Sequence, residues 1–321
     1  MRINRLDLNQ LATLDALLTE ASVSKAAVRV HLSQPAVSAV LAKLREFFSD
    51  LLLVPSGRVL SLTPFAQALV NPVHDLLLQA QALSRLRPQT IPSRFDRKIT
   101  VVASDYALSV FLLPLFKRAE IEAPGLTFEV RSLMGSITEE LDRGDVDMVV
   151  SLASGASPRH PSQNIFVDSF SSVVWEGNSL VGKTLTKKMF FELGHVVTVL
   201  GNGRVPTLDQ LAVDACKMQR RVDVRVPGFT LIPGCVVGTN RIGTLQTTLA
   251  KMLAKHLRLR VLRCPIPISD IQSSVQWHTY QTRDPAIQWT LAAIQDLASQ
   301  LQSAAKKNST SSSKKFRDVA D

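Results

Sequence analysis

A group of small hydrogen-bonding residues stands close together in the first fifty residues, and their side chains are of the types that contact DNA. Ser33, Gln34 and Ser38 come first, and Lys43 follows. Glutamine pairs with base edges in the major groove, serine contacts bases or phosphates, and lysine contacts phosphates. On an exposed helix N-terminus these types favour DNA reading, whereas an ordinary surface helix of a helical bundle is the alternative.

The surrounding sequence predicts two helices joined by a tight turn. Ser24 is expected to cap the first helix, and Ala26 is small enough for close helix packing. Ser33 is expected to cap the second helix, with Pro35 in the first turn, where a missing N–H costs nothing. The second helix buries Val37, Val40, Leu41 and Leu44 and exposes Gln34, Ala36, Ser38, Ala39 and Lys43.

Further elements are expected on either side of this pair. A helix from Leu8 to Leu18, capped by Asp7, presents an apolar face that includes Leu8. The segments Leu52–Val54 and Val59–Leu62 predict a hairpin with Arg58 at its tip, where it can reach phosphate or the minor groove.

Thr63 and Pro64 then begin a long helix that ends near Arg85 and is bent modestly by Pro72. Its apolar stripe consists of Leu69, Val73, Leu76, Leu77, Ala80 and Leu83. A helix of this length with one apolar side needs a partner, and we expect that partner to be its copy in a second subunit.

Beyond a Pro-rich segment from Arg87 to Arg97, which is typical of a linker, predicted strands alternate with predicted helices. We expect strands at Lys98–Ala103, Leu126–Leu133 and Met148–Leu152, with helices at Tyr106–Ala119 and Ile137–Arg143. This order predicts a parallel sheet with helices on both faces.

A second lobe is expected after one long strand, Phe166–Trp175, that crosses into it. Its strands are Val196–Leu200, Val222–Val226 and Leu259–Leu262, and its helices are Leu208–Met218 and Leu245–Ala254. The chain returns through a strand at Ser274–Tyr280 and a helix at Asp284–Gln302. The last segment contains KKNSTSSSKK and is expected to be a disordered basic tail.

Several motifs in this order closely resemble LysR-type transcriptional regulators, and within that family the branch of the nodulation regulators and the regulators of aromatic-compound degradation. The motifs are Asp7-Leu8-Asn9 with Leu14, Ala26-Ala27, the segment Leu32–Ser38, Leu62-Thr63-Pro64, Trp277-His278, and Asp284-Pro285 with Trp289. Many relatives have arginine where this chain has Ala39, so one common DNA contact is missing, and many have glycine where it has Ala66.

The resemblance implies an N-terminal all-α winged helix-turn-helix with a long linker helix, followed by a C-terminal α/β two-lobed domain like a periplasmic binding protein. The expected domains are a DNA-binding domain at 1–63, a linker and dimerisation helix at 64–90, an effector-binding domain at 91–303 and the tail at 304–321. Lobe I covers about 97–170 and 274–303, and lobe II covers about 171–273.

Two sets of site residues follow. The expected contacts to double-stranded promoter DNA are Ser24, Lys25, Ser33, Gln34, Pro35, Ala36, Ser38, Lys43 and Arg58. The expected contacts to a small-molecule effector are Ser104, Asp105, Gly135, Ser136, Gly201, Phe229 and Thr239. Ser104 ends the first strand, and a strand end followed by a helix faces the cleft between lobes. The alternative is that Asp105 and Ser136 only cap helices and that Phe229 only fills the core.

The expected class of effector follows from two opposite electrostatic effects near Ser104 and Asp105. Helix N-termini favour anions, but Asp105 opposes a full negative charge. A phenol, a quinol or a flavonoid-like aromatic fits both facts, and a simple carboxylate remains an alternative.

Bulk properties agree with DNA binding. A net charge of +10 and a pI of 9.8 favour a polyanionic partner, although a membrane surface would fit equally. Three cysteines without metal-ligand spacing indicate thiols in a reducing cytoplasm. We find no signal peptide and no spanning apolar run, so we expect a cytoplasmic protein with no membrane partner.

The predicted function is a cytoplasmic activator that pairs through its long helix, assembles into a homotetramer and contacts RNA polymerase. We expect no enzyme activity, cofactor or metal, because no nucleophile motif or phosphate loop is present, and we expect His278 to have a satisfied structural partner. One alternative is a redox-sensing regulator that uses Cys216 and Cys235. The other is a ligand-binding protein without DNA activity.

Overall fold

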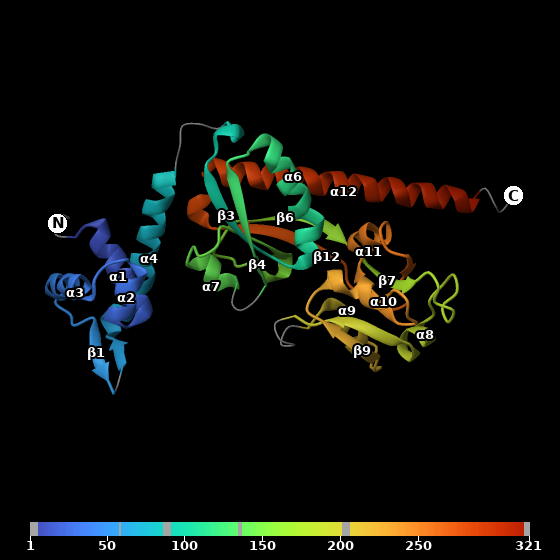
Figure 1. The fold of residues 1–321 in the computed structure, drawn as a ribbon, viewed down its shortest axis with the longest axis horizontal. Coiled ribbons are helices and arrows are strands. Elements are labelled where there is room, and N and C mark those ends of the chain that lie inside the picture. Colours follow the sequence, from blue (N-terminus) through green and yellow to red (C-terminus); the bar gives the residue numbers. More distant parts are fainter. Residues whose placement is uncertain (1–5, 58, 86–90, 134–136, 201–205, 318–321) are drawn as a thin grey trace. The chain divides into compact units, whose positions relative to one another are not determined.

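The chain forms two units in the computed structural model, residues 1–86 and residues 87–321 (Figure 1). The structure describes residues 6–57, 59–85, 91–133, 137–200 and 206–317. Arg58, Gly135, Ser136 and Gly201, which were predicted to be site residues, lie outside the described residues.

The first unit is a helical domain with one hairpin. Its elements are α1 (Leu8–Glu20), α2 (Val23–Arg29), α3 (Gln34–Phe48), β1 (Leu53–Ser56), β2 (Val59–Leu62) and α4 (Pro64–Arg85). Asp7 caps α1 and Ser33 caps α3, as predicted. The prediction for α2 was wrong: Ser22 accepts the N–H of Lys25 and caps that helix, which leaves Ser24 exposed inside its first turn.

The core of the first unit gathers apolar residues from α1, α2, α3, the hairpin and α4. Leu14, Val37 and Leu44 are at most 1% exposed, as their helical spacing predicted. Leu8 was expected on the same face but is 55% exposed, whereas Leu11, one turn further along α1, is buried. The buried face of α3 therefore fixes which of its residues remain outside.

The hairpin is held to α3 by side chains at its base. Asp50 accepts the N–H of Leu52 and the hydroxyl of Thr63, each at 2.7 Å. Arg45 donates to the carbonyl oxygens of Leu51 and Leu53. The Thr63 oxygen also accepts the N–H of Ala66, so one threonine caps α4 and anchors the hairpin.

The second unit contains two five-stranded sheets, and each defines a lobe. The first has the order β4-β3-β5-β12-β6, and β12 runs against both of its neighbours. Its strands are β3 (Arg97–Ala103), β4 (Leu126–Ser132), β5 (Met148–Leu152), β6 (Ser162–Asp168) and β12 (Ile271–Trp277). Its main helical elements are α5 (Asp105–Ala107), the π-helical segment η3 (Leu108–Leu112), α6 (Leu113–Glu122), α7 (Ile137–Asp142) and α12 (Pro285–Arg317).

The second sheet has the order β11-β7-β10-β8-β9, and β7 runs against both of its neighbours. Its strands are β7 (Phe170–Trp175), β8 (Gly194–Thr198), β9 (Arg221–Val226), β10 (Ile242–Gln246) and β11 (Leu259–Arg263). Its helices are α8 (Lys187–Glu192), α9 (Leu208–Ala215), η6 (Phe229–Leu231), α10 (Ile232–Val236) and α11 (Thr247–Ala254). Both sheets thus place their one reversed strand next to an edge.

Two predicted elements of the second unit were wrong. The long strand Phe166–Trp175 is two strands, β6 and β7, which part at Ser169 and belong to different sheets. The predicted helix from Leu245 starts only at Thr247, because Ile242–Gln246 is a buried strand between β7 and β8. The return crossing reaches the first sheet at Ile271.

The end of the predicted linker belongs to the second unit. Arg97 begins β3 and forms ion pairs with Asp147 and Asp284. The Asp284 side chain also accepts the N–H of Ala286 and so caps α12. These largely buried charges tie β3, the residue before β5 and the start of α12 together.

The tail also differs from the prediction, because α12 continues to Arg317 and the segment after Ala304 is helical that far. Extending a formed helix costs less than starting one, and Ala304, Ala305, Lys306 and Lys307 are good helix formers. The described part of the chain contains no helix that is both long and apolar enough to cross a membrane.

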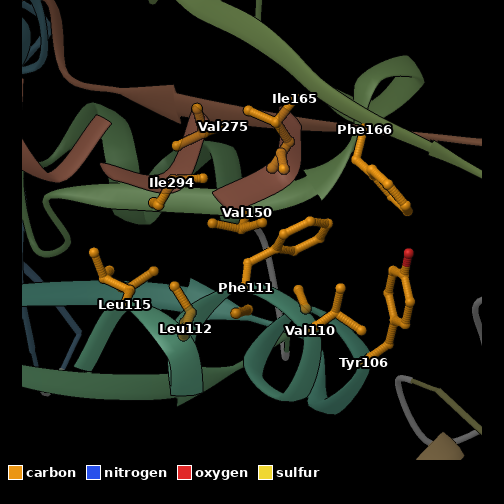
Figure 2. Packing of buried hydrophobic residues seen from close by; sticks show 14 of the residues in the cluster. Tyr106, Val110, Phe111, Leu112, Leu115, Val150, Ile165, Phe166, Val275 and Ile294 are labelled. Atoms are coloured by element: carbon orange, nitrogen blue, oxygen red, sulfur yellow. The ribbon is translucent and has the colours of Figure 1, made fainter. Parts of the chain in front are cut away.

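Phe111 lies at the centre of the core of the first lobe (Figure 2). It is fully buried, and its ring contacts Tyr106 and Phe166 edge to face, with centroids 6.1 and 5.6 Å away. Figure 2 shows the ring between Val150 and Ile165 of the sheet and its own helical segment. This aromatic contact therefore joins η3 to β6.

His195 on β8 should make the second unit less stable as the pH falls. Its Nε2 donates to the Phe190 carbonyl, and its Nδ1 is buried without a partner among the described residues. Burial lowers the pKa of His195 to about 4. In the unfolded chain the His195 imidazole takes up a proton near pH 6.5, whereas in the folded chain it stays neutral until about pH 4. The free energy of unfolding should therefore decrease as the pH drops from about 6.5 to 4.

All three tryptophans lie in the second unit, so their fluorescence reports its unfolding. We expect the free energy of unfolding to decrease between pH 7 and pH 5 by more in the wild type than in His195→Gln. Equal pH slopes for the two proteins would contradict this role of His195.

Candidate functional site

The exposed start of α3 forms the first candidate site. Ser33, Gln34, Pro35 and Ser38 are exposed, whereas Val37 on the opposite side is fully buried. The oxygen of Ser33 accepts the N–H of Ala36 at 3.4 Å, so the helix starts where the sequence predicted. An exposed N-terminal turn with amide and hydroxyl side chains has the shape and chemistry of a helix that enters the major groove.

The structure brings a residue of α2 to the same place. The Ser24 hydroxyl donates to Oε1 of Gln34 at 3.3 Å. Lys25 and Lys43 are exposed, and Ala36 is half-buried. Ser24 therefore orients the Gln34 amide, a role that its predicted capping function did not include.

A cavity of about 320 Å³ between the two sheets of the second unit forms the second candidate site. Its volume is in the range of small-molecule sites. The described residues that line it are mostly apolar, and the others are uncharged: Ser104, Tyr106, Ala107, Leu133, Thr138, Val149, Val150, Ser151, Leu152, Gly155, Phe170, Leu200, Pro206, Thr207, Leu208, Phe229, Gln246, Ile271, Ser273 and Gln276. Both lobes contribute to the wall.

The predicted effector residues divide into two groups. Ser104 and Phe229 line the cavity. Thr239 does not: its hydroxyl donates to the Val236 carbonyl at the end of α10, and its oxygen accepts the N–H of Arg241. Asp105 is not in the lining either, because its carboxylate is turned toward the second lobe.

Other lining residues were missed by the sequence analysis. Tyr106 and Gln276 were assigned only to a helix and a strand, and Gln246 was placed in a helix that does not exist there. One signal in the sequence could have identified Gln246. It is the polar residue at the end of the short segment Ile242–Gln246, and strand ends of this fold class face the cleft.

Tyr106 and Asp168 form a buried pair where the chain crosses between the lobes. The phenol donates to Oδ2 of Asp168 at 3.0 Å, and Asp168 also accepts the N–H groups of Ser169 and Thr248. Burial, together with the Asp168 carboxylate, raises the pKa of Tyr106, and burial raises the pKa of Asp168. The phenol therefore stays neutral and fixes the wall of the cavity at the crossing.

Asp105 joins the two lobes beside the cavity. Its Oδ2 accepts the backbone N–H of Thr230 at 2.7 Å and the Thr230 hydroxyl at 2.8 Å. A Cβ on Gly228 would lie only 2.5 Å from the same oxygen, so the carboxylate fits because residue 228 is glycine. We name Asp105, Gly228 and Thr230 the interlobe contact.

Gly228→Ala should break the interlobe contact, since the new methyl group displaces the Asp105 carboxylate. We expect the free energy of unfolding of the second unit to fall by about 1–3 kcal/mol, because two hydrogen bonds to a charged group are lost. Denaturant unfolding followed by tryptophan fluorescence measures this. Gly234→Ala is the matched control: its Cβ meets nothing within 4 Å, and it should be as stable as the wild type or more so. A Gly228→Ala protein as stable as this control would contradict the account.

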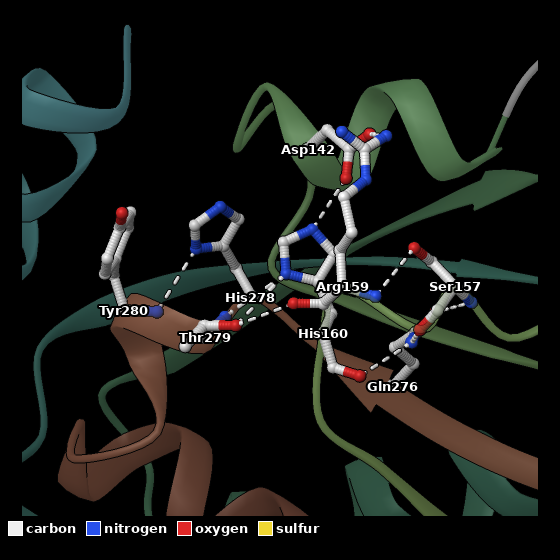
Figure 3. Close-up of polar contacts among 8 residues, drawn as sticks. All are labelled: Asp142, Ser157, Arg159, His160, Gln276, His278, Thr279 and Tyr280. Atoms are coloured by element: carbon white, nitrogen blue, oxygen red, sulfur yellow. Dashed lines mark hydrogen bonds and ion pairs between the residues drawn. The ribbon is translucent and has the colours of Figure 1, made fainter. Parts of the chain in front are cut away.

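Two histidines, His160 and His278, lie next to each other at one side of the first lobe (Figure 3), with ring centroids 4.6 Å apart and ring planes tilted by 46°. Nε2 of His160 lies 2.8 Å from Oδ1 of Asp142, and Nδ1 of His278 accepts the N–H of Tyr280 at 3.2 Å. The prediction that His278 has a structural partner is confirmed. No group of three or more potential metal ligands occurs among the described residues.

The cysteines occupy separate places. Cys216 packs against the cluster of α8 and α9, whereas Cys235 packs against the large core cluster, and both are free thiols. Burial raises the pKa of Cys264, the third free thiol. This arrangement gives no support to a redox pair of Cys216 and Cys235.

Comparison with known families identifies both units. Residues 8–67 match the family described as "Bacterial regulatory helix-turn-helix protein, lysR family", and residues 93–299 match "LysR substrate binding domain". The chain therefore belongs to the LysR family of transcriptional regulators, with a DNA-binding helix-turn-helix and an effector-binding domain. The predicted resemblance and fold class are confirmed.

Curated relatives agree with this family assignment, and solved structures agree with the fold. The chain is 38% identical to "Nodulation protein D 2" of Rhizobium tropici over 289 residues, which cover 90% of this chain and 92% of that protein. It is 35% identical to "Nodulation protein D" of Bradyrhizobium sp. (strain ANU 289), covering 94% and 90%. Its fold is similar to that of a full-length OxyR variant from Pseudomonas aeruginosa, with a TM-score of 0.65, 18% identity and coverage of 90% and 94%. It is also similar to the probable transcriptional regulator PA0477 of that organism, with a TM-score of 0.61, 22% identity and coverage of 92% and 98%.

Proposed function

We propose that this protein is a cytoplasmic transcriptional activator whose promoter binding is controlled by a small, uncharged aromatic effector. The observation that carries the proposal is the cavity between the two sheets, whose described lining is apolar or neutral. A charged ligand would bury its charge there without a described partner, which is costly. A planar ligand with apolar faces and few polar groups suits such a wall.

The proposed DNA contacts follow from the exposure of α3. Gln34 and Ser38 contact base edges, Ser33 lies at the helix start, and Lys43 contacts phosphate. The proposed DNA-binding surface also includes Ser24, Lys25, Pro35 and Ala36. Arg58 is a further proposed contact, although it lies outside the described residues. The Ser24–Gln34 hydrogen bond supports a fixed amide at the helix start.

We propose that two chains pair through α4. Val73 is buried against the core of the first unit, but Leu76 and Leu83 are 46% and 70% exposed. These two leucines suit contact with the same helix of a second chain. Such a dimer would place two α3 helices in successive major grooves, and further pairing to a homotetramer and contact with RNA polymerase complete the proposed activation.

The effector proposal assigns Ser104 and Phe229 to the cavity wall and leaves Thr239 out of it. Asp105 acts through the interlobe contact, next to Ser104 and Tyr106. The names of the curated relatives support a role in nodulation, and a role in aromatic-compound catabolism is the related alternative. Gly135, Ser136 and Gly201 lie outside the described residues and stay proposed contacts.

Titration calorimetry of the full chain with phenolic compounds and with aliphatic carboxylates tests the effector class. We expect saturable binding of at least one phenolic compound and weaker binding of it to Phe229→Ala. Thr239→Ala, which lies off the cavity, should bind as the wild type does. Tight binding of an aliphatic acid with no binding of aromatics would contradict the proposal.

A further inference from the structure

Most polar side chains around the cavity already have partners within the fold. Gln276 accepts the N–H of Ser157 at 3.0 Å, and its amide nitrogen donates to the carbonyl oxygens of Ser157 and His160 at 2.6 and 3.1 Å. The Tyr106 phenol donates to Asp168, and the Ser104 oxygen accepts the N–H of Ala107. These groups hold the wall in place.

Gln246 is the exception among these residues. It lines the cavity and is only 2% exposed, and its buried Oε1 has no hydrogen-bond partner among the residues that the structure describes. A buried acceptor without a partner destabilises a protein, and native structures contain few of them. Because Oε1 itself is closed to the cavity, a ligand group satisfies it only when the side chain turns toward the cavity.

The backbone fixes Gln246 at the point where the lobes meet. It ends β10 and pairs with Phe170 of β7, which also lines the cavity. The following N–H, that of Thr247, donates to the Ser169 carbonyl at 2.7 Å, and the Thr247 hydroxyl lies 2.9 and 2.8 Å from the hydroxyls of Ser169 and Ser171. The amide is therefore carried by an anchored strand end beside the first crossing between the sheets.

We propose that the side-chain amide of Gln246 binds a hydroxyl group of the effector and so selects hydroxylated over unsubstituted aromatics. The inference rests on the proposed function, in which the cavity binds an uncharged aromatic. A neutral hydroxyl fits this amide because it can donate to Oε1 and accept from the amide nitrogen. A ligand without that hydroxyl would leave Oε1 unsatisfied, and such sites discriminate against analogues that lack the polar group.

The test uses the full-length protein and three probes of the same scaffold: 7-hydroxyflavone, 4′-hydroxyflavone and flavone. Calorimetry at pH 6.5 measures their affinities for the wild type and for Gln246→Leu. We expect the wild type to bind at least one hydroxyflavone about tenfold more tightly than flavone. In Gln246→Leu this preference should disappear while flavone still binds, because the cavity remains.

Thermal unfolding without ligand adds a readout that separates ligand binding from a structural role. Gln246→Leu removes an unsatisfied buried acceptor, so its Tm should equal or exceed that of the wild type. A lower Tm would show that the amide supports the fold, and an unchanged hydroxyl preference would show that another group reads the hydroxyl; either overturns the assignment. Equal binding of all three probes by the wild type overturns it while leaving the proposed function intact. Binding of none of them contradicts the assignment but not the proposed function, which the wider panel of phenolic compounds and carboxylates tests.

Discussion

Phe111→Ala should lower the free energy of unfolding of the second unit by about 3–5 kcal/mol, the range for removing a buried phenylalanine from a core. The side chain is fully buried, and its ring contacts those of Tyr106 and Phe166 (Figure 2). Its removal leaves a cavity between η3 and the sheet. Guanidinium unfolding followed by tryptophan fluorescence measures the loss, since all three tryptophans are in this unit.

Ile121→Ala is the control for this change, because it lies on the adjoining α6 and is 83% exposed. A substitution at such a surface position should change stability by no more than about 0.5 kcal/mol. Similar losses for Phe111→Ala and Ile121→Ala would show that the described packing around Phe111 does not hold the lobe together.

Gln34→Ala should weaken binding to the preferred DNA site by about 1–3 kcal/mol and relax the preference at particular base pairs, because a base-edge contact is lost. The Gln34 amide is exposed at the start of α3 and held by Ser24. Fluorescence anisotropy on a set of duplexes, each with one base pair changed, measures both effects. Equal losses on specific and random DNA would refute a base-reading role.

Lys43→Ala separates phosphate contact from base reading. The side chain is exposed on the same helix, and loss of one phosphate contact should weaken all duplexes to a similar degree. It should also reduce the slope of the logarithm of the binding constant against the logarithm of salt concentration by about 0.9. A loss confined to one sequence would assign Lys43 to base reading instead.

The sequence predicted most of the first unit because its signals are local. Asp7, Ser33 and Pro35 mark helix starts by their own chemistry, and the stripe through Val37 and Leu44 marks the buried face. The cap of α2 was misplaced because Ser22 and Ser24 are equally good candidates by residue type. Only the backbone at Ser22, which is extended, distinguishes them.

The second unit was less predictable because its sheets depend on distant pairing. The segment Phe166–Trp175 was predicted to be one strand, and only the pairing shows that it divides at Ser169 between two sheets. The segment Ile242–Gln246 merges into a helical pattern, and its strand character comes from burial between β7 and β8. The cavity lies where the chain crosses between these sheets. Ser104 and Phe229 were predicted to line it, but Gln246 and Tyr106 were not, because their place in the wall depends on the strand pairing.

The interlobe contact beside the cavity could not be predicted for a related reason. Asp105 pairs with Thr230, which lies far along the chain, and this contact requires glycine at residue 228. The sequence pattern assigns Asp105 to the cap of the nearest helix, but Ser104 caps α5 and Asp105 is the first residue of that helix. Its contact with the other lobe follows only from the fold.

The most direct test of the central claim is a gel-shift and footprint measurement on the DNA upstream of this protein's own gene. The full chain is titrated with and without a panel of phenolic compounds over a series of salt concentrations, with random DNA as competitor. We predict a specific shift whose footprint changes with one of the compounds. Binding that is lost with salt, does not distinguish sequences and does not respond to any compound would contradict the account.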